Sequence, residues 1–181
     1  RFDGNGYSDE WVAEAKKRGR DCESSTPPTY DWLSDPKTVE LYSSTKVMTE
    51  TELKARQETA WELYSKKIDI EANILSDLTM NHILPVATRY QSILLDNVSK
   101  MKDIFSSKDF DSVASGEVGN IKDIAIHMSE ARRLVTELEK VRSEAQAEED
   151  ERTKAIMYHD RVVDYLTSIR EHVDALEMIV D

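Results

Sequence analysis

The chain has 181 residues, of which 39% are hydrophobic and 33% are charged, and its net charge is −12. This composition is typical of a globular chain long enough for one domain with an appendage, and it excludes an intrinsically disordered protein. The acidic balance argues against a nucleic-acid partner, and no apolar run approaches the ~20 residues needed to cross a bilayer. Cys22 has no second cysteine to pair with, which favours a reducing, cytoplasmic location.

The first expected element is a short helix that follows the turn "GNG". Ser8 is a suitable N-cap, and Gly19 suits the left-handed position that ends a helix. Tyr7 and Val12 occupy the two positions of a hydrophobic staple, so we expect them to pack together.

Residues 20–48 have the least regular pattern and predict two further short helices. The first is expected to begin near Thr29. The second has Asp35 as its cap and Pro36 at the first helical position. Because apolar residues such as Trp32 recur here, we expect the segment to pack on another part of the protein.

The strongest local signal is the stretch "VMTETEL" at residues 47–53. Thr49 and Glu52 have capping-box spacing, and Met48 and Leu53 form the matching staple. Apolar residues then recur at steps of three and four, which predicts a long helix over about 50–105.

Pro85 lies inside this long helical pattern. Its ring clashes with the carbonyl of Asn81 and removes one hydrogen bond. The apolar pattern continues beyond it, so we predict a kink and not a break.

The Ser- and Gly-containing stretch at 106–120 predicts a loop, and two heptad-patterned helices are expected after it. These helices should span about 118–146 and 152–180, with a charged turn between them. Packed along the kinked helix, they predict an all-α, antiparallel three-helix bundle with coiled-coil-like packing over residues 49–181.

The residues show little catalytic chemistry. None of His82, His127, His159 and His172 has a Glu three positions before it, and there is no zinc spacing and no phosphate-binding glycine loop. His159 falls on the apolar seam of the last helix, where a packed, hydrogen-bonded histidine is the ordinary interpretation.

Acidic and amide side chains cluster on the long helix. Asp69, Glu71 and Asp77 are close enough in sequence for acid–base work, although helix-surface ion pairs with Lys66, Lys67 or Arg89 are the commoner interpretation. Glu71, Asn73 and Asn81 are expected to make polar contacts between helices. These residues alone favour a free-standing helical interaction or adaptor module.

A succession of short motifs nevertheless resembles the C-terminal helical region of type III glutamine synthetases. The motifs are "NGYSDEW" at 5–11, "VMTETELKAR" at 47–56, "IEA" at 70–72, "ILP" at 83–85, "RYQ" at 89–91 and "VVDYLTSIREHVDALE" at 162–177. They cover nearly the whole chain in the order of that family.

The resemblance implies that residues 1–48 connect to an upstream catalytic domain and that the chain is cut from a longer protein on both sides. In that family glutamate, ammonia and ATP yield glutamine, with ATP and Mg²⁺ or Mn²⁺ bound upstream. We therefore assign no catalytic, cofactor-binding or metal-binding residue here.

The implied partners are the upstream domain and further copies of the subunit, without nucleic acid or membrane. The implied role is assembly or regulation. The structural or interface candidates are Tyr7, Trp11, Trp32, Thr49, Glu52, Glu71 and Pro85.

Overall fold

In the computed structural model, which describes residues 3–180, the chain is built from helices with no strand among the described residues. It divides into two compact units, residues 1–61 and 62–181, which are described separately. The predicted all-α class is confirmed.

The first unit contains α1 (Asp9–Lys17), α2 (Thr26–Thr29), the 3₁₀ turn η1 (Tyr30–Ser34), α3 (Pro36–Ser44) and the start of α4 (Glu50–Asp77). Ser8 caps α1 by accepting from the Trp11 N–H. Gly19 has a φ of 66°, and the Arg20 N–H donates to the Ala15 carbonyl, which closes the helix end as predicted.

The capping box that begins α4 is confirmed. The Thr49 N–H donates to Glu52 Oε2 at 2.7 Å, and the Glu52 N–H donates to Thr49 Oγ1 at 3.3 Å. These two hydrogen bonds satisfy backbone N–H donors that have no acceptor within the first helical turn.

Residues of α2 and η1 pack on the first turns of α4. The buried Trp61 donates from Nε1 to the Pro27 carbonyl, and Gln57 donates to the Tyr30 carbonyl and to Ser34 Oγ. The segment around Trp32 is therefore anchored, although its first helix begins at Thr26 and not near Thr29.

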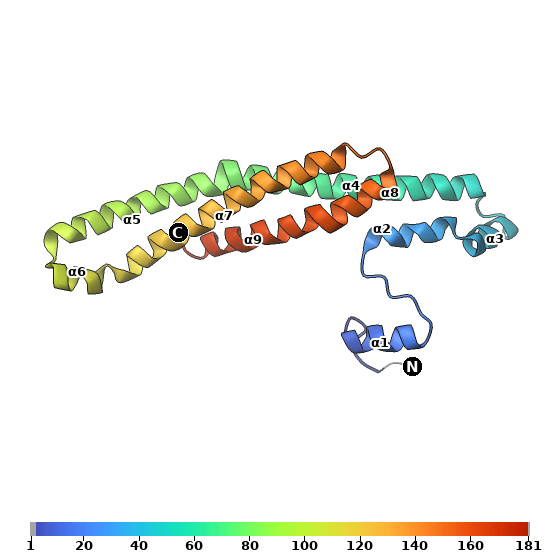
Figure 1. The fold of residues 1–181 in the computed structure, drawn as a ribbon, viewed down its shortest axis with the longest axis horizontal. Coiled ribbons are helices and arrows are strands. Elements are labelled where there is room, and N and C mark those ends of the chain that lie inside the picture. Colours follow the sequence, from blue (N-terminus) through green and yellow to red (C-terminus); the bar gives the residue numbers. More distant parts are fainter. Residues whose placement is uncertain (1–2, 181) are drawn as a thin grey trace. The chain divides into compact units, whose positions relative to one another are not determined.

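The second unit holds the remainder of α4, the π-helix η2 (Leu78–Ile83), α5 (Leu84–Ile104), α6 (Ser107–Val113), α7 (Ser115–Gln146), α8 (Glu151–Met157), η3 (Tyr158–Val162) and α9 (Val163–Glu177). The three segments α4, η2 and α5 form one long helix. Figure 1 shows α7 running back along this long helix and α9 returning beside α7.

Two buried clusters form the bundle core. One lies between α4, α7, η3 and α9 and contains Leu138, Val162 and Ile169, and the other lies between α5, α7 and the end of α9 and contains Leu84, Ile124 and Leu176. The antiparallel three-helix bundle is thus confirmed.

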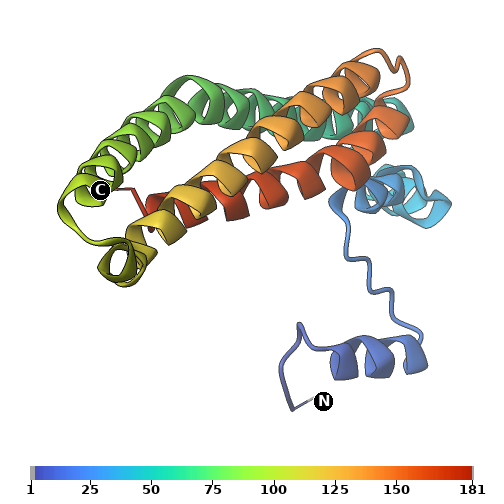
Figure 2. The same ribbon diagram turned by 60° about the vertical axis from the view of Figure 1, so that its left-hand side comes forward.

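Pro85 follows a widened turn of the long helix. The Leu84 N–H donates to the Thr79 carbonyl five residues earlier, which makes the segment before Pro85 a π-helix. The long helix bends between α4 and α5, as Figure 2 shows, and no residue breaks it.

The loop expected over 106–120 is wrong. Ser106 caps α6 by accepting from the Asp109 N–H, and α7 begins already at Ser115. The stretch "SSKD" at 106–109 has the Ser-x-x-acid pattern of a helix start, which its polar composition obscured.

Candidate interaction site on the long helix

Six apolar side chains between residues 63 and 93 of the long helix remain substantially exposed. Their exposed fractions lie between 43% and 64%, and the residues, which we call the apolar row, are Leu63, Ile70, Ile74, Leu78, Val86 and Ile93. Steps of seven and four residues place the first four on one helix face. An exposed apolar surface of this kind marks an interaction site on a protein surface.

The π-helix keeps both faces of the long helix in phase. The buried positions run from Ala72 through Thr79 and then step by five residues to Leu84, where three or four would be usual. The apolar row likewise steps by eight residues between Leu78 and Val86. Since the π-helix absorbs one extra residue, the buried and exposed faces both continue beyond Pro85.

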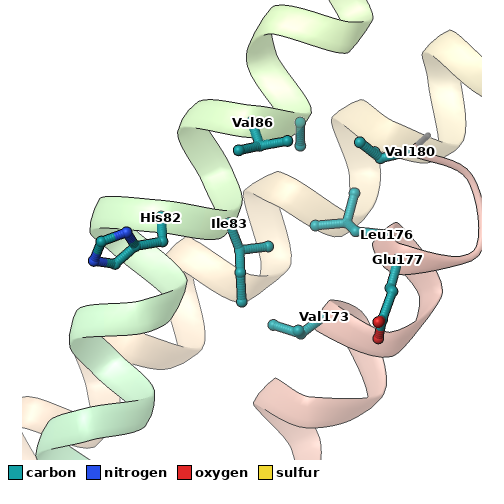
Figure 3. A pocket seen from close by; sticks show the side chains of 8 residues that line it. His82, Ile83, Val86, Val173, Leu176, Glu177 and Val180 are labelled. Carbon is teal, nitrogen blue, oxygen red and sulfur yellow. The ribbon is translucent and has the colours of Figure 1, made fainter.

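An apolar pocket of about 380 Å³ adjoins the row between η2, α5 and α9. In Figure 3, Ile83 and Val86 point across the pocket toward Val173, Leu176 and Val180. His82 and Glu177, also lining residues, stand at its edges. The pocket is therefore apolar inside and polar only at the rim.

A second hollow of about 410 Å³ lies between α4 and α9. Ile74 and Leu78 of the apolar row line it together with Leu166, and Glu71 and Arg170 supply its charges. Together the two hollows extend the apolar surface from the row toward α9.

A polar network joins α4, α7 and η3. Asp69 Oδ1 accepts hydrogen bonds from Arg142 Nε at 2.7 Å, from Gln146 Nε2 at 2.9 Å and from Tyr158 Oη at 2.9 Å. Arg142 also donates to the Glu139 carboxylate at 3.0 Å. One carboxylate oxygen therefore connects three helical segments.

The network shifts the titration of its members. Burial by itself raises the pKa of the Asp69 carboxyl, but the hydrogen bonds from Arg142, Tyr158 and Gln146 outweigh it, so the pKa lies below the ordinary 3.8. Burial and the hydrogen bond to Asp69 both raise the pKa of the Tyr158 phenol. Asp69 is thus held ionised and Tyr158 protonated at neutral pH.

The structure places Asp69 differently from the expectation that it pairs with Lys66, Lys67 or Arg89. Its partners come from other helices because Arg142 occupies a heptad position of α7 that faces α4. That polar residue on an apolar seam was the one sequence signal for the network. Asn81 bonds to Asp77 on its own helix at 2.7 Å, which corrects the interhelical contact expected for Asn81.

The last helix has its expected phase at Val162, Ile169 and Leu176, which are buried, but differs from it at one position of the seam. Tyr158 is 2% exposed at the position expected for His159. His159 is half-buried, bonds to Asp160 and lies beside the Tyr64 ring, so it is packed and hydrogen-bonded as predicted. This local difference lies at the widened η3 turn, in which the Val163 N–H donates to the Tyr158 carbonyl.

The aromatic interface candidates lie in the first unit. The Tyr7 side chain is 98% exposed, so the expected staple with Val12 is wrong; the turn formed by the Asn5 carbonyl and the Ser8 N–H leaves Tyr7 in solvent. Trp11 is half-buried and Trp32 is 52% exposed. Their role at an interface stays a prediction.

The other candidates have defined local positions. Thr49 and Glu52 form the cap of α4, Glu71 is exposed at the hollow beside Arg170, and Pro85 is exposed just after η2. Sequence reasoning missed the pair His127–His172, because nothing in the spacing of two residues on different helices reveals that they meet.

Within residues 3–180, no group of three or more His, Cys, Asp and Glu side chains is arranged to hold a metal ion. Among the same residues, no helix is both long enough and apolar enough to span a bilayer.

Comparison with known proteins decides the family. The family described as "Glutamine synthetase C-terminal domain" matches residues 1–102, more than half of the chain. The chain belongs to this family. The resemblance to glutamine synthetases seen in the sequence motifs is thereby confirmed.

Relatives of this glutamine synthetase C-terminal domain extend the match along the whole chain. A glutamine synthetase of Bacteroides fragilis (strain YCH46) is 37% identical over 181 residues, which are 100% of this chain and 25% of the relative. A type-3 glutamine synthetase of Dictyostelium discoideum is 28% identical over 99% of this chain and 24% of its own length. The chain therefore spans about a quarter of the length of these relatives.

Proposed function

We propose that this chain is the C-terminal helical portion of a longer type III glutamine synthetase. The complete enzyme would ligate ammonia to glutamate with ATP and act in the cytoplasm, and its ATP and Mg²⁺ or Mn²⁺ ligands would belong to the part outside these 181 residues. The observation that carries the proposal is that glutamine synthetases match this chain along nearly its whole length. The chain covers only about a quarter of the length of those relatives.

Within that enzyme, we propose that the helical portion supports contacts between subunits and contributes no catalytic group. The apolar row supports this role, because six large side chains along one helix face are unusual on a surface that stays in water. Two hollows beside the row offer space for side chains of a neighbouring subunit.

The catalytic part of the proposal is tested by assaying ATP-dependent glutamine formation. We expect activity from the full-length protein that contains this sequence and none from the 181-residue chain alone. A full-length protein without glutamine-forming activity, or an isolated chain with it, would contradict the assignment. Circular dichroism of the isolated chain checks that a negative result comes from folded protein.

A further inference from the structure

Two histidines from different helices face each other at the α7–α9 interface. His127 Nδ1 lies 2.9 Å from His172 Nδ1, and the ring centroids are 5.2 Å apart. Both residues are half-buried. The two Nδ1 atoms are thus within hydrogen-bond distance of each other, on side chains that are partly exposed to water.

The pair can be held together in two ways. In the neutral state one Nδ1–H donates to the other Nδ1, which fixes opposite tautomers on the two rings. Alternatively, both Nδ1 lone pairs can point at one metal ion. The proton that one ring carries on Nδ1 then moves to the Nε2 of the same ring, so metal binding releases no proton from the pair.

The distance between the nitrogens selects the geometry of such an ion. With metal–nitrogen bonds of about 2.1 Å, a nitrogen separation of 2.9 Å corresponds to an angle of about 90° at the metal. That angle is the cis angle of square-planar or octahedral coordination, whereas a tetrahedral ion needs nitrogens roughly 3.4 Å apart.

We propose that His127 and His172 form a two-nitrogen site for a divalent transition-metal ion, which would clamp α9 to α7. Imidazole nitrogens in cis positions suit Cu²⁺ and Ni²⁺ better than Zn²⁺, and water completes the coordination. Hard cations such as Mg²⁺ and Ca²⁺ prefer oxygen ligands and do not bind here. The site is separate from the apolar row and does not depend on the proposed enzyme activity.

Thermal unfolding of the 181-residue chain with Ni²⁺ tests the site. Ni²⁺ is the preferred probe because Cu²⁺ oxidises thiols and the chain contains Cys22. At a hundredfold excess of Ni²⁺ over its dissociation constant, we expect the Tm to rise by roughly 5–10 °C. Calorimetric titration should give one ion per chain at this site.

Matched variants distinguish this site from other binding on an acidic surface. His127→Asn and His172→Asn keep a polar group near the position of Nδ1 but remove a metal ligand, so each should abolish the Ni²⁺ shift. His82→Asn, which removes an exposed histidine on the long helix, should keep the shift, and Mg²⁺ should produce none. Circular dichroism without metal verifies that each variant is folded.

Other results of the same experiments would contradict the proposed metal site. The absence of a Ni²⁺ shift in the unmodified chain would overturn the proposal. A shift that persists in folded His172→Asn protein, or an equal shift with Mg²⁺, would assign the effect to other surface groups and overturn it as well.

Discussion

Replacement of Asp69 by alanine is expected to lower the free energy of unfolding of this chain by about 3 kcal/mol at pH 7. The substitution removes the one acceptor shared by Arg142, Gln146 and Tyr158. Arg142, whose side chain is only 15% exposed, would keep Glu139 as its remaining ion-pair partner. Urea unfolding followed by circular dichroism measures the loss.

A control for this substitution lies on the same helix. Asp77 is exposed and accepts one hydrogen bond from Asn81, so Asp77→Ala should change the unfolding free energy by less than about 0.5 kcal/mol. Tyr158→Phe combined with Asp69→Ala should be less destabilising than the sum of the single changes, because both remove the same bond. Equal effects of Asp69→Ala and Asp77→Ala would contradict the role of the network.

The pH dependence of the Asp69 contribution follows from the direction of its pKa shift. The folded pKa lies below the ordinary 3.8, so the stabilisation is present above that value and is lost as the pH falls through the folded pKa. The difference in stability between the unmodified chain and Asp69→Asn should therefore be constant from about pH 5 to neutrality and shrink below pH 4. A difference that grows on acidification would contradict the assignment.

The second large effect is expected at the apolar row. In the proposed full-length enzyme, Ile74→Glu should weaken subunit association about a hundredfold, because a carboxylate would be buried where an apolar side chain packs. In the isolated chain Ile74 is 51% exposed, so the same change should alter the unfolding free energy by only about 0.5 kcal/mol. Sedimentation velocity at several protein concentrations measures the association.

Ile126→Glu is the matched control for Ile74→Glu. Ile126 is 57% exposed on α7 and lies outside the apolar row, so this change should leave the mass of the assembled enzyme unaltered. If Ile74→Glu leaves the mass of the assembled enzyme unaltered but destabilises the full-length protein, the row packs within one subunit. That outcome would contradict the proposed role in assembly.

Much of the fold was predictable because its determinants are local. The cap formed by Thr49 and Glu52, the Asp35–Pro36 start of α3 and the Gly19 end of α1 depend on side chains within a few residues of one another. The heptads of α7 likewise specify their own buried face, with Ile124 and Leu138 fully buried.

The face of the long helix was harder to predict because part of its buried side, just before Pro85, is built from small and polar residues. Ala72, Ser76 and Thr79 face the core, while the larger Leu78 and Ile93 face outward. Apolar periodicity therefore pointed to the exposed row as strongly as to the core. The five-residue step through η2 also lies outside the steps of three and four that the prediction used.

The candidate sites depend on contacts between residues far apart in the chain. Asp69 and Tyr158 are separated by 89 residues, and His127 and His172 by 45. The position of Arg142 on the α7 seam was compatible with a buried ion pair, but it did not indicate which carboxylate was the partner. For the histidines, the rotation of α7 against α9 decides whether they meet.

The most direct test of the central claim is thiol labelling at position 74. A Cys22→Ser, Ile74→Cys protein would be labelled both as the isolated chain and as the full-length protein, with Ile126→Cys as the reference position in each. We predict rapid labelling at position 74 in the isolated chain and strong protection in the assembled full-length protein, while position 126 reacts alike in both. Equal reactivity of position 74 in the two proteins would show that the apolar row stays in water and would contradict its role in assembly.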